Sequence, residues 1–192
     1  MNNVENLIRE SINAKTALLK KDYIRTIEEM GKNMINTFKN GKKLLIAGNG
    51  GSVADAQHFA AEMVGLVDSK KRNSKALPAL ALSTNASIIT AVGNDMGFDN
   101  IFSRQIEALG EKGDTFVGIT TSGASTNIIN ALKSAKVKGL VTIGFLGKDG
   151  GEAKNHCDLS LIVPSTNTQR IQECHILIIH ILSELIDNAF YE

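Results

Sequence analysis

The chain has 192 residues, of which 43% are hydrophobic and 21% are charged, and its formal net charge at pH 7 is +1. This length and composition are typical of one domain with a full core, and a charge so near neutrality gives no electrostatic reason to bind nucleic acid or a membrane surface. Two cysteines are too few for a disulfide framework, and the polar N-terminus lacks the apolar region of a secretion signal, so we expect a cytoplasmic protein.

Two amphipathic helices are predicted before the first strand. Apolar residues recur at helical spacing over residues 3–21 and 22–38, and Asn40-Gly41 has the pattern of a helix end. This much helix exceeds what one small sheet needs as cover. We therefore interpret residues 1–40 as an oligomerisation surface attached to an α/β core at residues 41–192. The alternative is a helix pair folded onto its own domain.

The most informative stretch is residues 43–62, which predicts a buried strand, a glycine turn and a helix. The apolar run from Leu44 to Ala47 is typical of a sheet that is covered on both faces. Gly50 and Gly51 allow the backbone to approach a ligand closely, and Ser52 is predicted to be the N-cap of the helix. Such a turn offers backbone N–H groups to an anion, most often a phosphate.

The helix after this turn carries two side chains that can hold or move protons. His58 and Glu62 are four residues apart, so they are predicted to lie on one helical face. Asp55 is predicted to lie in the first turn, where a carboxylate complements the helix dipole. The spacing thus places an imidazole and a carboxylate side by side.

The rest of the core alternates strands and helices. Alternation of this kind predicts a flavodoxin-like, doubly wound parallel sheet of five strands within a three-layer α/β sandwich. We expect the helix at 88–92 to be closed by Gly93-Asn94-Asp95. The remaining strands are predicted at 80–82, 115–119, 140–145 and 159–163, and the helices at 88–92, 98–109, 126–137 and 168–190.

A hydroxyl-rich loop, Thr120 to Ser125, follows the strand at 115–119 and opens the next helix. Hydroxyl and amide donors there can surround an oxyanion without a basic residue, although such loops often serve only as helix caps. Its place at the carboxyl end of a strand favours ligand binding. The charged loop Asp68–Lys75 is interpreted as a connection, with a phosphate or partner contact as the alternative.

The last helix, residues 168–190, is apolar nearly all round, so we expect it to be buried between subunits. Its polar residues exclude a membrane span. Gln172, His175 and His180 lie in this apolar setting. Buried polar groups need partners, so these side chains either satisfy one another and the backbone or face a site.

Taken together and in order, several short motifs make the whole chain similar to the sugar isomerase (SIS) domain family. Each motif alone is weak, and it is their combination that is specific. In this sequence they are Gly48-Asn49-Gly50-Gly51-Ser52, Gln57-His58-Phe59-Ala60, Gly93-Asn94-Asp95, Phe102-Ser103-Arg104-Gln105, Thr121-Ser122-Gly123, and Arg170-Ile171-Gln172-Glu173 with His175 and His180.

The resemblance is to family members that act on seven-carbon sugar phosphates. It implies a cytoplasmic homotetramer that interconverts sedoheptulose 7-phosphate and D-glycero-D-manno-heptose 7-phosphate, toward activated heptose for surface polysaccharide such as lipopolysaccharide. It also implies one zinc ion per subunit, with matching ligand positions at His58, Glu62, Gln172 and His180. Implied substrate contacts are Asn49, Gly50, Gly51, Glu62, Asn94, Asp95, Thr120, Thr121, Ser122, Ser125 and Gln172.

The residues suit this chemistry, with one geometric difficulty. Moving a carbonyl between C1 and C2 needs a base, for which Glu62 is the natural candidate, and a group such as His180 that stabilises the enediolate or shuttles a proton. Gln172 and His180 are eight residues apart, about 12 Å along a helix, so both reach one ion only by leaning toward it. A tightly bound ligand also cannot serve freely as the base.

Two other classes of function remain as alternatives. One relative in this family binds the bacterial replication initiator DnaA, and its pattern lacks the glutamate and the final histidine. This chain keeps Glu62 and His180, which favours the enzyme. A sugar-phosphate sensor is disfavoured for the same reason, because sensing requires no acid–base pair.

Overall fold

The computed structural model describes residues 3–65, 67 and 75–190, and its centre is a five-stranded parallel sheet. The strand order β2-β1-β3-β4-β5 is the flavodoxin-like order, so the predicted doubly wound sheet is confirmed. Every predicted strand is present, with ends that differ by at most two residues. The strands are β1 (Leu44–Gly48), β2 (Ala79–Ala81), β3 (Thr115–Thr120), β4 (Val141–Gly147) and β5 (Leu159–Val163).

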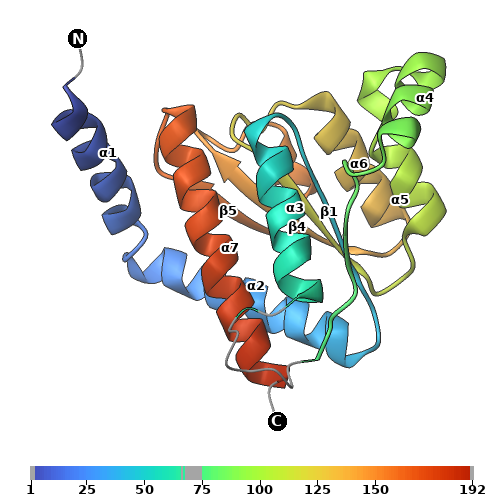
Figure 1. Cartoon of the computed structure of the whole chain (residues 1–192), viewed down its shortest axis with the longest axis horizontal. Coiled ribbons are helices and arrows are strands. Elements are labelled where there is room, and N and C mark those ends of the chain that lie inside the picture. The colour runs from blue at the N-terminus through green and yellow to red at the C-terminus, as the bar shows by residue number, and fades with distance from the viewer. Residues whose placement is uncertain (1–2, 66, 68–74, 191–192) are drawn as a thin grey trace.

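Helices cover both faces of the sheet, which confirms the three-layer sandwich (Figure 1). Successive residues of β1 separate the two cores: Leu44 and Ile46 join the cluster under α2, α3 and α7, whereas Leu45 and Ala47 join the cluster under α5 and α6. The helices are α1 (Val4–Ala17), α2 (Lys21–Lys39), α3 (Gly51–Val64), α4 (Ala86–Met96), α5 (Ser103–Leu109), α6 (Thr126–Val137) and α7 (Thr168–Phe190), with short 3-10 turns η1 (Phe98–Asn100) and η2 (Ala153–His156).

The start of α3 differs from the prediction. The helix begins at Gly51, one residue after Gly50, which takes a φ of 56° that favours glycine. Ser52 is therefore inside the first turn, 3% exposed, and not the N-cap. Asp55 consequently lies beyond the first turn and does not complement the dipole as predicted.

The helices between β2 and β3 also correct two predictions. Helix α4 runs from Ala86 to Met96, so Gly93-Asn94-Asp95 lies inside it and does not close it. It ends at Gly97, whose φ of 85° breaks the helix. The single helix predicted over 98–109 is instead the 3-10 turn η1 followed by α5.

The two N-terminal helices differ in how they pack. Helix α2 buries Met30 and Met34 completely against the core. Helix α1 lies at the rim of the molecule beside the start of α7 (Figure 1), and its side chains Val4, Ile8 and Ile12 are 72%, 55% and 56% exposed. The alternative of a helix pair folded onto its own domain therefore describes α2 better than α1.

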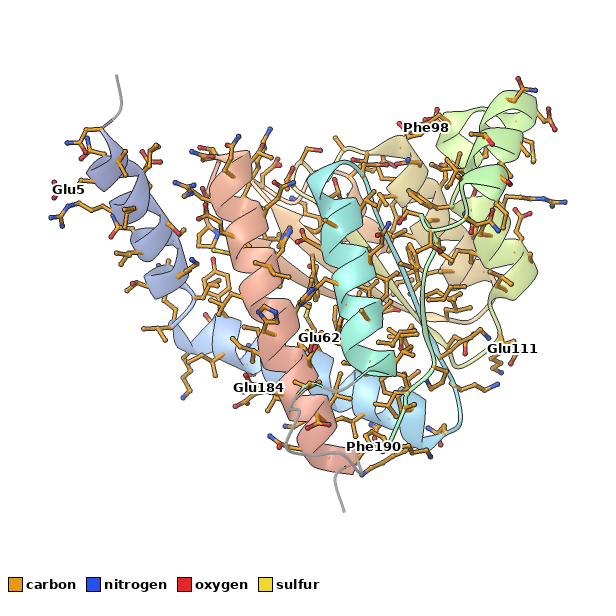
Figure 2. All side chains as sticks on the ribbon, viewed as in Figure 1. Glu5, Glu62, Phe98, Glu111, Glu184 and Phe190 are labelled. Carbon is orange, nitrogen blue, oxygen red and sulfur yellow. The ribbon has the colours of Figure 1, made fainter. Side chains whose placement is uncertain are left out.

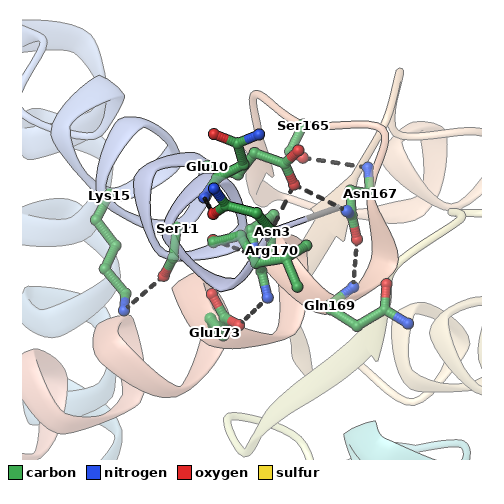
Figure 3. Close-up of polar contacts among 11 residues, drawn as sticks. Asn3, Glu10, Ser11, Lys15, Ser165, Asn167, Gln169, Arg170 and Glu173 are labelled. Atoms are coloured by element: carbon green, nitrogen blue, oxygen red, sulfur yellow. Dashed lines mark hydrogen bonds and ion pairs between the residues drawn. The ribbon is translucent and has the colours of Figure 1, made fainter. Parts of the chain in front are cut away.

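Polar contacts tie α1 to the start of α7 (Figure 3). Arg170 Nη1 donates to the backbone carbonyl of Leu7 at 2.7 Å and lies 3.9 Å from a Glu10 carboxylate oxygen. The same guanidinium pairs with Glu173 on α7. The Arg170 side chain is only 13% exposed, so its contacts are shielded from water. They therefore stabilise the packing of α1 on α7 more than an exposed ion pair would.

Helix α7 carries its apolar face into the core, as expected, but leaves one side open. Ile171, Ile178 and Ile179 are fully buried, while Ile181 and Leu185 are 37% and 40% exposed. Over the part of the chain that the structure describes, no helix is long and apolar enough to cross a membrane.

His175 on α7 makes stability depend on acidity. Its Nε2 donates to the carbonyl of Leu146 at 3.0 Å, and burial lowers its pKa from 6.5 to about 4. Between these values the unfolded chain binds the proton and the folded chain does not. The free energy of unfolding should therefore be highest above pH 6.5 and fall by roughly 3 kcal/mol as the pH drops toward 4.

We expect His175→Gln to remove this dependence, because a glutamine amide can still donate to Leu146 but does not titrate. Urea unfolding at pH 7.5 and pH 5 gives the two free energies for each protein. Asp55, whose raised pKa acts in the opposite sense, is present in both proteins and cancels in the comparison. An equal loss of stability in the variant on acidification would contradict the assignment.

Candidate active site

Three polar side chains meet where α3 packs against α7. His58 Nε2 lies 2.8 Å from His180 Nε2 and 3.2 Å from a carboxylate oxygen of Glu62. Figure 2 labels Glu62 at this seam between the two helices. The His58 and Glu62 side chains are 42% and 20% exposed, and His180 is exposed, so the group is open to a small solute. The side-by-side placement predicted for His58 and Glu62 is confirmed.

The chemistry of this trio (His58, Glu62 and His180) fits a divalent metal ion. One ligand atom from each residue lies within 4.8 Å of the others, and the three form a group that could hold a metal. Two imidazole nitrogens and one carboxylate oxygen are ligands that suit zinc. A neutral imidazole has only one N–H, so one of the two facing Nε2 atoms can donate a proton while the other accepts it. The pair therefore also suits proton transfer.

Gln172, the fourth ligand position implied by the resemblance, lies near the start of the seam. A Cβ atom added to Gly51 would overlap its side-chain amide, so the amide rests directly on the Gly51 backbone. Gly51 precedes His58 by seven residues, about 10 Å along the helix. The structure thus brings together three of the four positions, and Gln172 as a ligand stays a prediction.

A fourth titratable group, Asp55, occupies the stripe of α3 that carries His58 and Glu62. It is 9% exposed, its Oδ2 atom is buried, and burial raises its pKa from 3.8 to about 6. The sequence pattern predicts for Asp55 only a role at the helix dipole. The spacing of three and seven residues to His58 and Glu62 is a signal that could have placed it on their face.

The hydroxyl loop after β3 folds around its own side chains. Thr120 Oγ1 lies 2.9 Å from Ser125 Oγ and 3.5 Å from Ser122 Oγ, and Ser122 Oγ accepts from the backbone N–H of Ala124. Ser125 is the N-cap residue of α6, but its side chain makes no capping hydrogen bond. The hydroxyls therefore face one another at the strand end instead of serving as helix caps.

A second loop supports the hydroxyl loop from behind. Gly123, Gly150 and Gly151 have φ values of 66°, 83° and 51°. A Cβ at Gly123 would overlap the carbonyl oxygen of Gly150, and one at Gly151 would overlap the backbone of Gly123. The backbone N–H of Ala153 donates to the Gly123 carbonyl at 2.9 Å. Close backbone packing thus fixes the position of the hydroxyl loop.

Two of the implied substrate contacts lie away from the seam. Asn94 and Asp95 are exposed on α4, where Asn94 Nδ2 donates to Asp95 Oδ1 at 2.7 Å. Figure 1 places α4 at the edge of the molecule, apart from α7, with α3 between them. The single chain therefore does not bring this pair to the trio. The alternative phosphate loop, Asp68–Lys75, lies outside the described residues except for Lys75.

A parallel sheet with a glycine-rich loop after β1 and a hydroxyl-rich loop after β3, together with a polar cluster between α3 and α7, is the arrangement of an α/β domain that binds a ligand at its strand ends. The SIS domain family model matches residues 9–147, and the chain belongs to this family.

Within this family, the chain is similar to proteins that are named phosphoheptose isomerase. The chain is 52% identical over 192 residues to a phosphoheptose isomerase from Clostridium acetobutylicum, covering 99% of this chain and 96% of the relative. Its fold is similar to phosphoheptose isomerase GmhA from Neisseria gonorrhoeae, with a TM-score of 0.90, 44% identity and coverage of 96% and 97%. A phosphoheptose isomerase structure from Francisella tularensis gives a TM-score of 0.91 at 37% identity, with 96% of each chain covered.

Proposed function

We propose that this chain is an aldose–ketose isomerase that interconverts D-sedoheptulose 7-phosphate and D-glycero-D-manno-heptose 7-phosphate, toward activated heptose for lipopolysaccharide or capsule. The observation that carries the proposal is the meeting of His58, Glu62 and His180, in a chain about half identical to enzymes named phosphoheptose isomerase. Incubating the purified protein with sedoheptulose 7-phosphate tests it, because an aldose phosphate must accumulate. Absence of the aldose under conditions where the protein is folded would refute the assignment.

In the proposed reaction Glu62 takes a proton from C1 of the ketose. The C1–H electron pair forms the C1–C2 double bond, and the C2 carbonyl oxygen receives negative charge. His180 donates a proton to that oxygen, which gives the enediol. Loss of the O1 proton and return of a proton to C2 then yield the aldose, so no atom is gained or lost. A positioned base contributes about 10²–10⁴-fold to such a step.

We further propose that the site takes zinc. His58, His180 and one oxygen of Glu62 would hold the ion, with Gln172 as the predicted fourth ligand. When bound, the ion supplies positive charge that polarises the sugar oxygens. A carboxylate has two oxygens, so the second oxygen of Glu62 stays available for the carbon-bound proton.

The substrate phosphate is proposed to bind at the hydroxyl loop, with Gln172, Asn49, Gly50 and Gly51 contacting the substrate from the neighbouring elements. Thr120, Thr121, Ser122 and Ser125 supply hydroxyl or backbone donors there, and the N-terminus of α6 supplies positive potential.

Removing two of these hydroxyls should weaken substrate affinity more than turnover. For Ser122→Ala and Ser125→Ala we expect the KM for the sugar phosphate to rise roughly tenfold each, because each loses a hydrogen bond to a charged group. Steady-state kinetics measures this, with Ser134→Ala on the far turn of α6 as the matched control. An unchanged KM in both variants would show that the substrate phosphate binds at another place in the protein.

We propose that the working form is a cytoplasmic homotetramer in which α1 and α2 form contacts between subunits. Exposed apolar side chains on α1 support this, because a soluble chain rarely leaves such a row uncovered. The placement of α4 apart from the trio supports a site at a subunit boundary, with Asn94 and Asp95 supplied by a neighbouring copy.

Light scattering tests the assembly. We expect a mass about four times 20.6 kDa, and Ile8→Glu with Ile12→Glu should lower the mass and activity together, since buried charges oppose association. Lys112→Glu, at an exposed position between α5 and β3, makes the same change in charge away from α1 and α2 and is the control. A stable, fully active monomer would contradict both the tetramer and the shared site.

A further inference from the structure

A reciprocal pair of side-chain amides joins the two ligand loops. Asn49 Nδ2 donates to Asn127 Oδ1 at 2.8 Å, and Asn127 Nδ2 donates to Asn49 Oδ1 at 2.9 Å. Asn49 directly follows β1, while Asn127 lies in the first turn of α6, two residues after Ser125. Because β1 and β3 are neighbours, the pair bridges the carboxyl ends of two adjacent strands.

Burial makes this bridge rigid. Asn127 is 2% exposed, so water cannot easily replace a lost partner. Turning one amide alone would bring nitrogen to nitrogen and oxygen to oxygen, so the two side chains can reverse only together. Asn127 therefore couples the orientation of the Asn49 amide to that of its own buried amide, and the Asn49 amide cannot turn independently.

The pair leaves part of Asn49 available. An asparagine amide offers two N–H donors and an oxygen with two acceptor positions, and the pair uses one of each. The bonded N–H in a reciprocal amide pair is the one cis to the carbonyl oxygen, so the second N–H points away from the partner. Asn49 is only half-buried and directly follows β1, so this side chain lies at the strand ends and not within the core.

We infer that Asn127 is a positioning residue for the isomerisation. It does not touch the substrate, but it aims the second N–H of Asn49 at an oxygen of the sugar phosphate and holds the glycine turn in register with the hydroxyl loop. The inference rests on the proposed function, in which Asn49 contacts the substrate.

Asn127→Leu tests the inference, because leucine has a similar volume and cannot pair with an amide. We expect the KM for sedoheptulose 7-phosphate to rise roughly tenfold, with kcat changing less, since one oriented hydrogen bond is lost. Asn130→Leu is the matched control on the same helix, where the native amide donates to the carbonyl of Asp99 at 3.1 Å. It should keep KM within about twofold.

A double variant separates positioning from stability. If Asn127 acts only through Asn49, then Asn49→Ala combined with Asn127→Leu should have the same kcat/KM as Asn49→Ala alone. Multiplying effects would overturn the inference. So would an Asn127→Leu protein that melts at a lower temperature but keeps wild-type KM, because that result marks a purely structural residue. If the leucine variant does not fold, Asn127→Ser carries the same expectations.

Calorimetric binding distinguishes this inference from the proposed function. A wild-type protein without turnover refutes the isomerase, and the amide pair is then judged by the Kd for sedoheptulose 7-phosphate. A roughly tenfold weaker Kd in Asn127→Leu but not in Asn130→Leu supports positioning. Equal values in all three proteins overturn it.

Discussion

Replacing Glu62 by glutamine should lower turnover of the heptose phosphate by about 10²-fold or more while leaving the protein folded. Glutamine keeps the size of the side chain but cannot accept the C1 proton. The native side chain is partly exposed and lies 3.2 Å from His58, so the amide can take its place without a large cavity. The measurement is kcat, because the lost interaction belongs to the transition state.

Glu107→Gln is the matched control, since this exposed glutamate on α5 pairs only with the nearby Arg104 among the contacts that the structure describes. It should retain wild-type kcat and unfolding temperature. Full activity in Glu62→Gln would show that this glutamate is not the base. Asp55 would then be the next candidate for the base.

His180→Asn should reduce kcat to a similar extent. Asparagine removes the imidazole that contacts His58 at 2.8 Å, and with it a proton carrier and a ligand position. Zinc content, measured on the purified variants, separates these two roles. Loss of metal from His180→Asn together with retention in Glu62→Gln would make the histidine mainly a ligand and the glutamate mainly a base.

The two substitutions should not have additive effects. A base and the group that stabilises its product act as a unit, so the double variant should be little worse than either single variant. Multiplicative losses would mean that Glu62 and His180 act in separate steps. Folded and fully active single variants would refute the assignment of isomerisation to this seam.

Much of the fold was predictable because its signals are local. The bounds of α6, β5 and α7 match the predictions, since each has a clear apolar pattern and a marked boundary such as Pro164 after β5. The end of α4 was not predictable in this way. Gly93 resembles a helix end, but the backbone tolerates it inside the helix, and Gly97 provides the actual break.

The candidate site was predictable only in part. Spacing along α3 gives the pairing of His58 and Glu62, but their contact with His180 spans 122 residues and depends on how α7 packs. The resemblance to SIS domains supplied that residue. Neither local spacing nor the resemblance identified Asn127, because its importance arises only when the ends of β1 and β3 come together.

The interlocked backbones of Gly123, Gly150 and Gly151 have a consequence for how this protein can vary. All three positions have a left-handed backbone conformation that favours glycine. At Gly123 and Gly151 a Cβ atom would overlap the backbone of the facing loop, so even alanine would displace one loop from the other, whereas at Gly150 it would meet the side chains of Ile162 and Lys154. In a library of all single substitutions selected for heptose-dependent growth, these positions should accept only glycine. Rejection of substitutions at these positions would then result from backbone packing and not from contact with the substrate. Selection data alone do not distinguish these two causes.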